Sequence, residues 1–194
     1  MELEVRKSGS LASIKQGEQD GILVTHVSGK YVEAALAGRL FSVANQAAVT
    51  TTAALATTWT GLGVCNPTGS GKNLIIHEFG WALSVVGPDD GIVGLMSSDD
   101  TGFAAALTAK AAMNGRGASV ARCDDGATIA TPILERVCGT IGTGATTVQI
   151  SVPQSIYQIA GSIILPPGRS IMTYTTTATT AAAVFFFLWE EVSI

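Results

Sequence analysis

The sequence predicts an all-β fold: an antiparallel, jelly-roll-like β-sandwich that follows an N-terminal extended arm with a small hairpin. Three observations support this class. Short apolar or alternating segments recur at roughly even spacing, turn sequences rich in Gly, Pro and Asp separate them, and no long amphipathic helical pattern interrupts them. Eight such strands fit a jelly roll. The expected division places the arm and hairpin in residues 1–43 and the sandwich in residues 44–194.

The first 36 residues differ in character from the rest of the chain. Residues 1–20 are polar, mixed in charge and weakly periodic, which indicates an arm that orders when something binds it. Residues 22–27 form a short apolar run, residues 28–30 are a turn sequence, and residues 31–36 return. This pattern predicts a small hairpin.

Residues 74–85 give the clearest strand signal. Bulky side chains alternate with smaller or polar ones, so we expect the bulky side to face the core. Gly80 in the middle of this segment predicts a bulge or the close approach of a neighbour. The residues expected on the core side are Ile75, His77, Phe79, Trp81, Leu83 and Val85.

Further strands are expected along the chain, with residues 66–73 as a loop. Residues 103–113 are rich in Ala and fit either a short helix or a loop that crosses one end of the sandwich. The segments with strand-like composition or alternation are residues 47–52, 59–65, 92–96, 118–123, 146–152, 161–165 and 169–175.

The last expected strand, residues 182–189, is bulky on both faces. A strand with two apolar faces is central in its sheet, or it has one face in the core and the other against another subunit. We expect it to end at Glu190 and Glu191.

The low charge of the chain indicates assembly. Only 13% of the residues are charged, 11 basic and 15 acidic, whereas ordinary soluble domains contain about 25%. A monomer of this mass exposes about 8,700 Å², or about 330 Å² for each charged residue. We therefore expect partner subunits, together with Thr, Ser, Asn and Gln side chains, to cover the exterior, as in a homo-oligomer or a larger lattice.

Composition also argues against several classes of protein. A hydrophobic fraction of 47% rules out intrinsic disorder, and a net charge of −4 argues against a nucleic-acid-binding surface. The longest apolar run, residues 181–189, is shorter than the roughly 20 residues of a membrane-spanning helix, and no secretion signal is visible. Cys65, Cys123 and Cys138 have no CxxC spacing and are expected to be reduced thiols of a chain made in the cytosol.

No motif predicts a catalytic, cofactor-binding or metal site. The Gly69-Ser70-Gly71-Lys72 segment departs twice from the phosphate-loop pattern, and the acidic pairs at 89–90, 99–100 and 124–125 lack the spacing of a calcium loop. His26 and His77 have no local zinc-ligand partner. No GxSxG nucleophile elbow is present, although a triad assembled in space stays open. We therefore expect no enzyme activity and no cofactor.

Carbohydrate binding is the alternative that the aromatic residues leave open. Trp59, Trp81 and Trp189 could stack on a sugar ring, although the latter two lie in strand patterns that favour core or subunit contacts. A glycan-binding protein would carry exposed Trp or Tyr clusters at its loop end.

Three segments in order carry a resemblance to a family. They are Gly38-Arg39-Leu40-Phe41 through Ala44-Asn45-Gln46-Ala47, then Trp59-Thr60-Gly61-Leu62 through Asn66–Leu74, then Pro167-Gly168-Arg169 through Phe187-Leu188-Trp189-Glu190-Glu191. Over residues 38–192 the chain resembles small jelly-roll-like structural proteins of tailed-phage virions, which decorate or cement the head or form spikes. These motifs are structural, and the resemblance supplies no catalytic residue.

The resemblance implies a function and partners. It implies a non-enzymatic bacteriophage virion protein, made in the bacterial cytoplasm, that binds the capsid surface as a decoration or cement protein and stabilises it. Its expected partners are the major capsid protein and sister subunits, in a homotrimer, with no nucleic acid and no membrane. The alternative is a receptor- or glycan-binding module of a phage spike or tail.

Overall fold

The computed structural model describes residues 3–7, 10–14, 29–83, 91–99, 102–112, 117–141, 155–179 and 183–194. The chain divides into two compact units, residues 1–33 and residues 34–194. Each unit is described by itself.

The first unit contains a two-stranded hairpin where the sequence predicted an extended arm. Strands β1 (Leu3–Lys7) and β2 (Ser10–Ile14) pair antiparallel, with Leu3 opposite Ile14 and Lys7 opposite Ser10. Apolar residues alternate with charged ones in β1, a pattern typical of a strand with one polar face.

The hairpin predicted for residues 22–36 is not supported over its second half. Residues 22–28 lie outside the described part of the chain, and the residues expected to return as a strand form the short helix α1 (Val32–Leu36). The reason is local composition, because Glu, two Ala and Leu in succession are strong helix formers.

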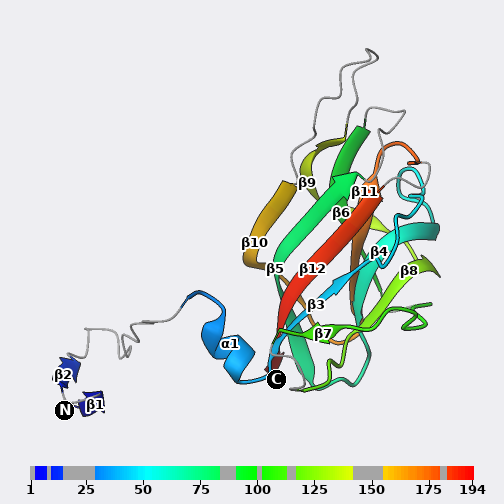
Figure 1. Ribbon diagram of the computed structural model, residues 1–194. Helices are drawn as coiled ribbons and strands as arrows, with labels where there is room; N and C mark the ends of the chain where they lie inside the picture. Colours follow the sequence, from blue (N-terminus) through cyan, green and yellow to red (C-terminus); the bar gives the residue numbers. More distant parts are fainter. Residues whose placement is uncertain are drawn as a thin grey trace, which may run out of the picture. The chain divides into compact units, whose positions relative to one another are not determined.

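The second unit is a sandwich of two antiparallel five-stranded sheets. The sheet nearer the viewer in Figure 1, here the front sheet, has the order β10 (Ser155–Leu165), β5 (Lys72–Leu83), β12 (Ala183–Ser193), β3 (Leu40–Ala44) and β7 (Lys110–Ala111). The back sheet has the order β8 (Arg122–Thr128), β4 (Thr58–Asn66), β11 (Arg169–Thr175), β6 (Gly91–Asp99) and β9 (Ile133–Ile141).

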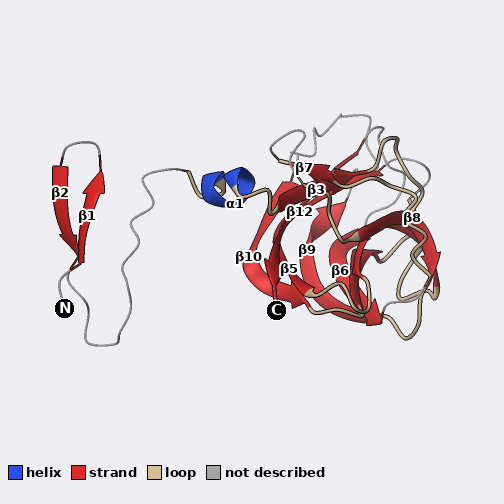
Figure 2. Cartoon of the chain, turned by 90° about the horizontal axis from the view of Figure 1, so that it is seen from below, coloured by secondary structure: helices blue, strands red, loops and turns tan. Residues whose placement is uncertain are grey.

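The strand pairing has the form of a rolled ribbon. Strand β3 pairs with β12, β4 with β11, β5 with β10 and β6 with β9, so the chain folds back on itself as one long antiparallel ribbon. The ribbon then rolls up, which brings β5 beside β12 and β6 beside β11. Figure 2 shows the two sheets curving around a common interior. This is the architecture of a jelly roll, and the predicted fold class is confirmed.

The predicted domain boundary falls inside a strand. Strand β3 includes residues on both sides of position 43, and it pairs with the central strand β12, Val43 opposite Phe187. The sandwich therefore begins before residue 44. The boundary between the two compact units lies between residues 33 and 34.

Aromatic side chains from neighbouring strands of the front sheet dominate the core. Phe79 on β5 stacks on Trp81 and on Phe185 of β12, with ring centroids 5.6 and 6.0 Å apart. Phe41 of β3 stacks on Trp189 at 6.3 Å. Each of these rings removes a large apolar area from water, so they supply much of the free energy of folding.

A bulge at His77 reverses the predicted facing of the first half of β5. Glu78 pairs with Leu188, but Ile76 pairs with the next residue, Trp189, so His77 has no opposite residue on β12. Leu74 and Ile76 are consequently buried, as are Phe79 and Trp81 beyond the bulge. The assignment of Ile75 and His77 to the core side is wrong, because one extra residue moves the alternation to the other face.

The outer face of the back sheet carries a second, smaller core. Trp59, Met96 and Met172 are buried there, and Phe103 stacks on Trp59 at 6.2 Å. Phe103 belongs to this cluster, and the segment continues without a helix to β7 at the edge of the front sheet. Over residues 102–112 the loop alternative therefore holds and the helix alternative does not.

The remaining strand predictions have mixed outcomes. Residues 59–65, 92–96, 161–165 and 169–175 lie in β4, β6, β10 and β11. Residues 47–52 make only an isolated bridge at Val49, and residues 118–121 precede β8 without pairing. Residues 146–152 lie outside the described part of the chain. Strand β9 was not predicted, because Glu135 and Arg136 interrupt its apolar pattern.

The backbone of β9 lies so close to Gly94 of β6 that a substitution at this position tests the pairing of the two strands. A Cβ atom at position 94 would lie 2.3 Å from the carbonyl oxygen of Arg136, so a Gly94→Ala substitution must displace the β9 backbone. We expect a loss of about 1–3 kcal/mol in the free energy of unfolding, measured by urea denaturation. Gly126→Ala is the control, since its nearest contact would be an ordinary 3.4 Å, and it should change stability by less than about 0.5 kcal/mol. Equal effects of the two substitutions would contradict this account.

Candidate assembly surface

The outward side chains of the front sheet form three rows across β10, β5, β12 and β3. Strand register places Ile156, Gly80, Phe186 and Ala44 in the first row and Gln158, Glu78, Leu188 and Ser42 in the second. The third row contains Ile164, Ile75, Glu190 and Leu40. Two mainly apolar rows therefore flank a mixed one.

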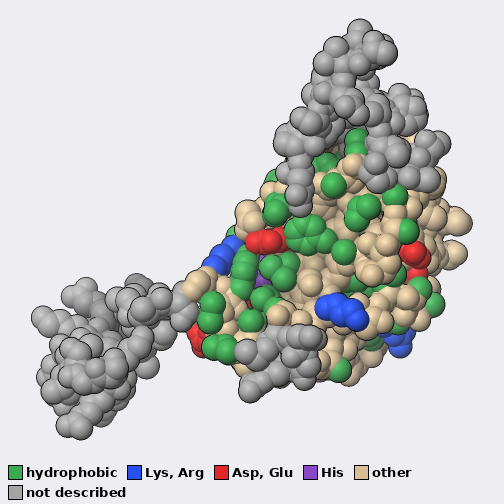
Figure 3. All heavy atoms as spheres, viewed as in Figure 1, with side chains coloured by type: hydrophobic (Ala, Val, Ile, Leu, Met, Phe, Trp, Pro, Cys, Tyr) green, Lys and Arg blue, Asp and Glu red, His purple; other side chains and the backbone are tan. Residues whose placement is uncertain are grey.

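The apolar members of these rows make a surface that we call the outer patch, and several of them are accessible. Ile156 is 50% and Ile164 is 53% exposed, and the other four are half-buried. Figure 3 shows hydrophobic side chains gathered over β10, β5 and β12 on this face. Contiguous exposed apolar side chains of this kind mark interaction sites. The outer patch consists of Ile75, Ile156, Ile164, Phe186 and Leu188 from these rows, together with Val184, which lies two residues before Phe186 on the same face of β12.

The patch follows from the sequence of β12. Its side chains alternate between the core and the outside, and both sets are bulky. Phe186 lies flat over Gly80, where a Cβ atom would be only 2.0 Å from the ring. The close approach predicted for Gly80 is confirmed, and the missing side chain at position 80 gives the Phe186 ring its place on the sheet.

Polar groups lie at defined positions on the same face. Gln158 Nε2 donates a hydrogen bond of 3.0 Å to Glu78. Glu190 forms an ion pair with Arg39 at 3.2 Å. The second carboxylate oxygen of Glu190 lies 3.6 Å from His77 Nε2. Arg39 balances the charge of Glu190 within one subunit, so a partner that covers Glu190 does not need to supply a counter-ion for it.

The two sheets differ in how their outer faces are covered. Phe103 and its neighbours close the outer face of the back sheet near Trp59 and Met172. Over the outer patch, Ile156 and Ile164 stay accessible among the described residues. Among the described residues, the chain itself thus covers the apolar outer face of the back sheet and leaves the outer patch of the front sheet exposed.

Strand β12 is longer than predicted, and Glu191 lies within it. The strand continues to Ser193, and Glu191 is 1% exposed. Its carboxylate accepts hydrogen bonds from Lys72 Nζ at 2.8 Å, Ser119 Oγ at 2.6 Å and the Val120 amide at 2.9 Å. A buried carboxylate is stable only with such partners, and this one fastens residues 119–120 to the end of the sheet.

The polar motifs singled out in the sequence have structural partners. Asp124 is buried and accepts hydrogen bonds from the amides of Ala104, Asp125 and Gly126, as turn-stabilising aspartates do. Lys72, at the end of the glycine-rich segment, is held by Glu191. Asp89, Asp90, Asp100 and His26 lie outside the described residues.

The cysteines and tryptophans are mostly interior. None of the three cysteines forms a disulfide, and burial raises the pKa of Cys123 to about 12 and that of Cys138 to about 11. Trp59, Trp81 and Trp189 are buried in the two cores, so none of them forms the exposed cluster that the glycan-binding alternative predicts.

In the described ranges, no group of three or more His, Cys, Asp and Glu side chains has a geometry suited to a metal ion. Within the same ranges, no helix is long and apolar enough to cross a membrane.

No protein-family model matches the chain, and neither the curated proteins nor the solved structures contain a significant match.

Two adjacent glutamates allow a matched test of the buried network. Glu191→Gln removes the charge that faces Lys72 in the interior, and we expect a loss of about 3 kcal/mol in the free energy of unfolding. Glu190→Gln breaks a more exposed pair with Arg39 and should cost less than about 1 kcal/mol. Urea denaturation at pH 7 measures both. A smaller loss for Glu191→Gln than for Glu190→Gln would refute the proposed role of the network.

Proposed function

We propose that this chain is a non-enzymatic structural protein of a tailed-phage virion. It binds the capsid surface as a decoration or cement protein and assembles as a homotrimer. The observation that carries the proposal is the outer patch, an apolar surface on the outer face of the front sheet. The central strand of that sheet, β12, is bulky on both faces. A surface of this kind is suited to contact with a neighbouring protein.

The size of the face fits a protein interface. Strands β10, β5 and β12 have 11 or 12 residues and are therefore about 36 Å long, β3 with its five residues is about 17 Å long, and neighbouring strands are about 4.8 Å apart. The face thus offers about 600 Å², which approaches the roughly 800 Å² per partner of a standard interface. In a lattice of many copies, a contact of this size gains further from avidity.

Composition supports the same proposal. With only 13% charged residues, the chain has little ionic surface to keep it apart from other copies. The residue pattern that resembles phage decoration proteins covers the whole sandwich, and the jelly-roll-like fold agrees with it. The first unit, with its β1–β2 hairpin, is the proposed arm that contacts the shell or a neighbouring subunit.

Charge placed on the patch should prevent self-association. Ile156 and Ile164 are each about half exposed, so the double substitution Ile156→Glu and Ile164→Glu should leave the fold intact. We expect the wild-type chain to give the mass of a trimer by light scattering at micromolar concentration and the variant to give that of a monomer, because carboxylates would be desolvated at the contact.

The matched control is Leu55→Glu, a substitution at an exposed apolar residue outside the outer patch. It should leave the trimer mass unchanged. A wild-type monomer, or a variant that stays trimeric, would refute the outer patch as the contact between sister subunits.

Deletion of residues 1–28 tests the arm separately. The remaining chain begins before α1 and keeps every strand of the sandwich, so we expect its circular dichroism and thermal midpoint to be retained. Binding to purified capsids, measured by co-sedimentation, should fall at least tenfold. Undiminished binding by the truncated chain would show that the sandwich alone carries the capsid contact.

A further inference from the structure

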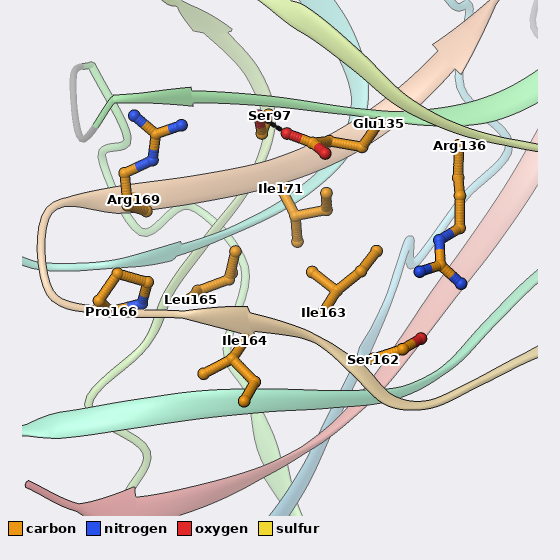
Figure 4. A pocket seen from close by; sticks show the side chains of 10 residues that line it. All are labelled: Ser97, Glu135, Arg136, Ser162, Ile163, Ile164, Leu165, Pro166, Arg169 and Ile171. Atoms are coloured by element: carbon orange, nitrogen blue, oxygen red, sulfur yellow. Dashed lines mark hydrogen bonds between the residues drawn. The ribbon is translucent and has the colours of Figure 1, made fainter.

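A cavity opens on one side of the sandwich, between the edge strands β9 and β10. Its volume is about 330 Å³, near the lower limit of small-ligand pockets. Glu135 and Arg136 line it from β9, and residues 162–165 line it from β10 (Figure 4). Ile171 of β11 contributes to its wall. Because Ile164 and Glu135 are exposed, the mouth of the cavity reaches solvent.

Arg136 is the one cation of this cavity without a counter-ion among the described residues. Arg169, at the other end, pairs with Asp99. The Glu135 carboxylate accepts a hydrogen bond from Ser97. Figure 4 shows the Arg136 guanidinium projecting toward Ser162 of β10, with Ile163 beside it. A half-buried guanidinium with five donors is a receptor for a carboxylate, which it can bind through two parallel hydrogen bonds.

Neither edge strand is regular enough to accept a further strand. The pairing of β9 with β6 shifts twice, at Cys138 and at Glu135. Strand β10 departs from β5 between Gln158 and Ile163, where Ala160 and Gly161 both have positive φ. Bulges at edges prevent strand addition. A partner would therefore be recognised here by an inserted side chain rather than by backbone pairing.

The surroundings of the mouth are apolar. Leu134 and Val137, the neighbours of Glu135 and Arg136 along β9, are 39% and 54% exposed. Ile164 of β10, which lines the cavity, is 53% exposed. The ligand should thus carry a carboxylate with apolar groups on both sides of it.

We propose that this cavity binds an acidic side chain, Glu or Asp, flanked by apolar residues in a peptide segment of a partner protein. The carboxylate pairs with Arg136, and the flanking apolar side chains cover the exposed residues of β9 and β10. The inference goes beyond the proposed function, because it concerns a cavity that shares only Ile164 with the outer patch and can be tested on the isolated protein without capsids or trimers.

Two probes that differ by one group test the proposal: acetyl-Leu-Glu-Ile-amide and acetyl-Leu-Gln-Ile-amide. Binding to the full chain is followed by the NMR shifts of the arginine side-chain N–H groups and by calorimetry. We expect the Glu peptide to bind at least tenfold more tightly and to shift the Arg136 signal. The charged 4-methylpentanoate ion, a carboxylate without a peptide, should bind more weakly than the Glu peptide.

Substitutions assign the effect to the residue. In Arg136→Gln the preference for Glu over Gln should disappear, and in Arg136→Lys, which keeps the charge without the fork, it should be intermediate. Arg122→Gln, at the opposite edge of the back sheet, is the control and should keep the full preference. Thermal melts establish that each variant is folded.

Several results would overturn the proposal. They are equal affinity for the two peptides, a preference that survives in folded Arg136→Gln, and binding of 4-methylpentanoate as tight as that of the Glu peptide, which would identify a small carboxylate as the ligand. A wild-type chain that is a monomer but keeps the peptide preference would count against the proposed function alone.

Discussion

The architecture depends on one constraint, which is that β12 is bulky on both faces and lies between β5 and β3. Its inward residues, Phe185, Phe187 and Trp189, build the core, and β5 pairs with the strand along its whole length while β3 pairs with it over Phe186–Glu190. The outward residues then have to lie on the outer face of the front sheet. The outer patch is therefore a geometric consequence of how the core is built, and its cost in exposed apolar surface falls if a partner covers it.

The sequence predicted the parts of the fold in which periodicity and turn chemistry agree. Strands β4 and β11 adjoin turn sequences that contain Pro or Gly, and β12 is a continuous run of bulky residues; all three were found close to their expected positions. Irregular pairing limited the rest. The bulge at His77 inverts half of β5, and the two shifts in β9 mix polar with apolar residues, so no simple period marks that strand. Bulges depend on neighbouring strands and leave little trace in local sequence.

The candidate surface was predictable in kind but not in detail. Two apolar faces on residues 182–189 indicated a subunit contact, yet the contributions of Ile156 and Ile164 depend on strand order, which sequence alone does not give. The cavity at Arg136 could not be predicted, because β9 and β10 are edge strands of different sheets, and the sequence alone does not give the strand order. The two glutamates at 190 and 191 led to the prediction that the strand ends there, but β12 continues to Ser193. Glu191 is buried because Lys72 of β5 and residues 119–120 supply hydrogen bonds to its carboxylate.

Strand β10 connects the two surfaces. Before its bulge Ile156 faces outward, and after it Ile164 again faces outward while Ile163 lies against the cavity. The bulge, with Ala160 and Gly161 at positive φ, is what lets one strand serve the outer patch along its whole length and still line the cavity beside Arg136. A partner that covers the edge of the patch must therefore pass the mouth of the cavity. One apolar contact and one charged contact can then act together, the first supplying binding free energy and the second fixing the register of the partner.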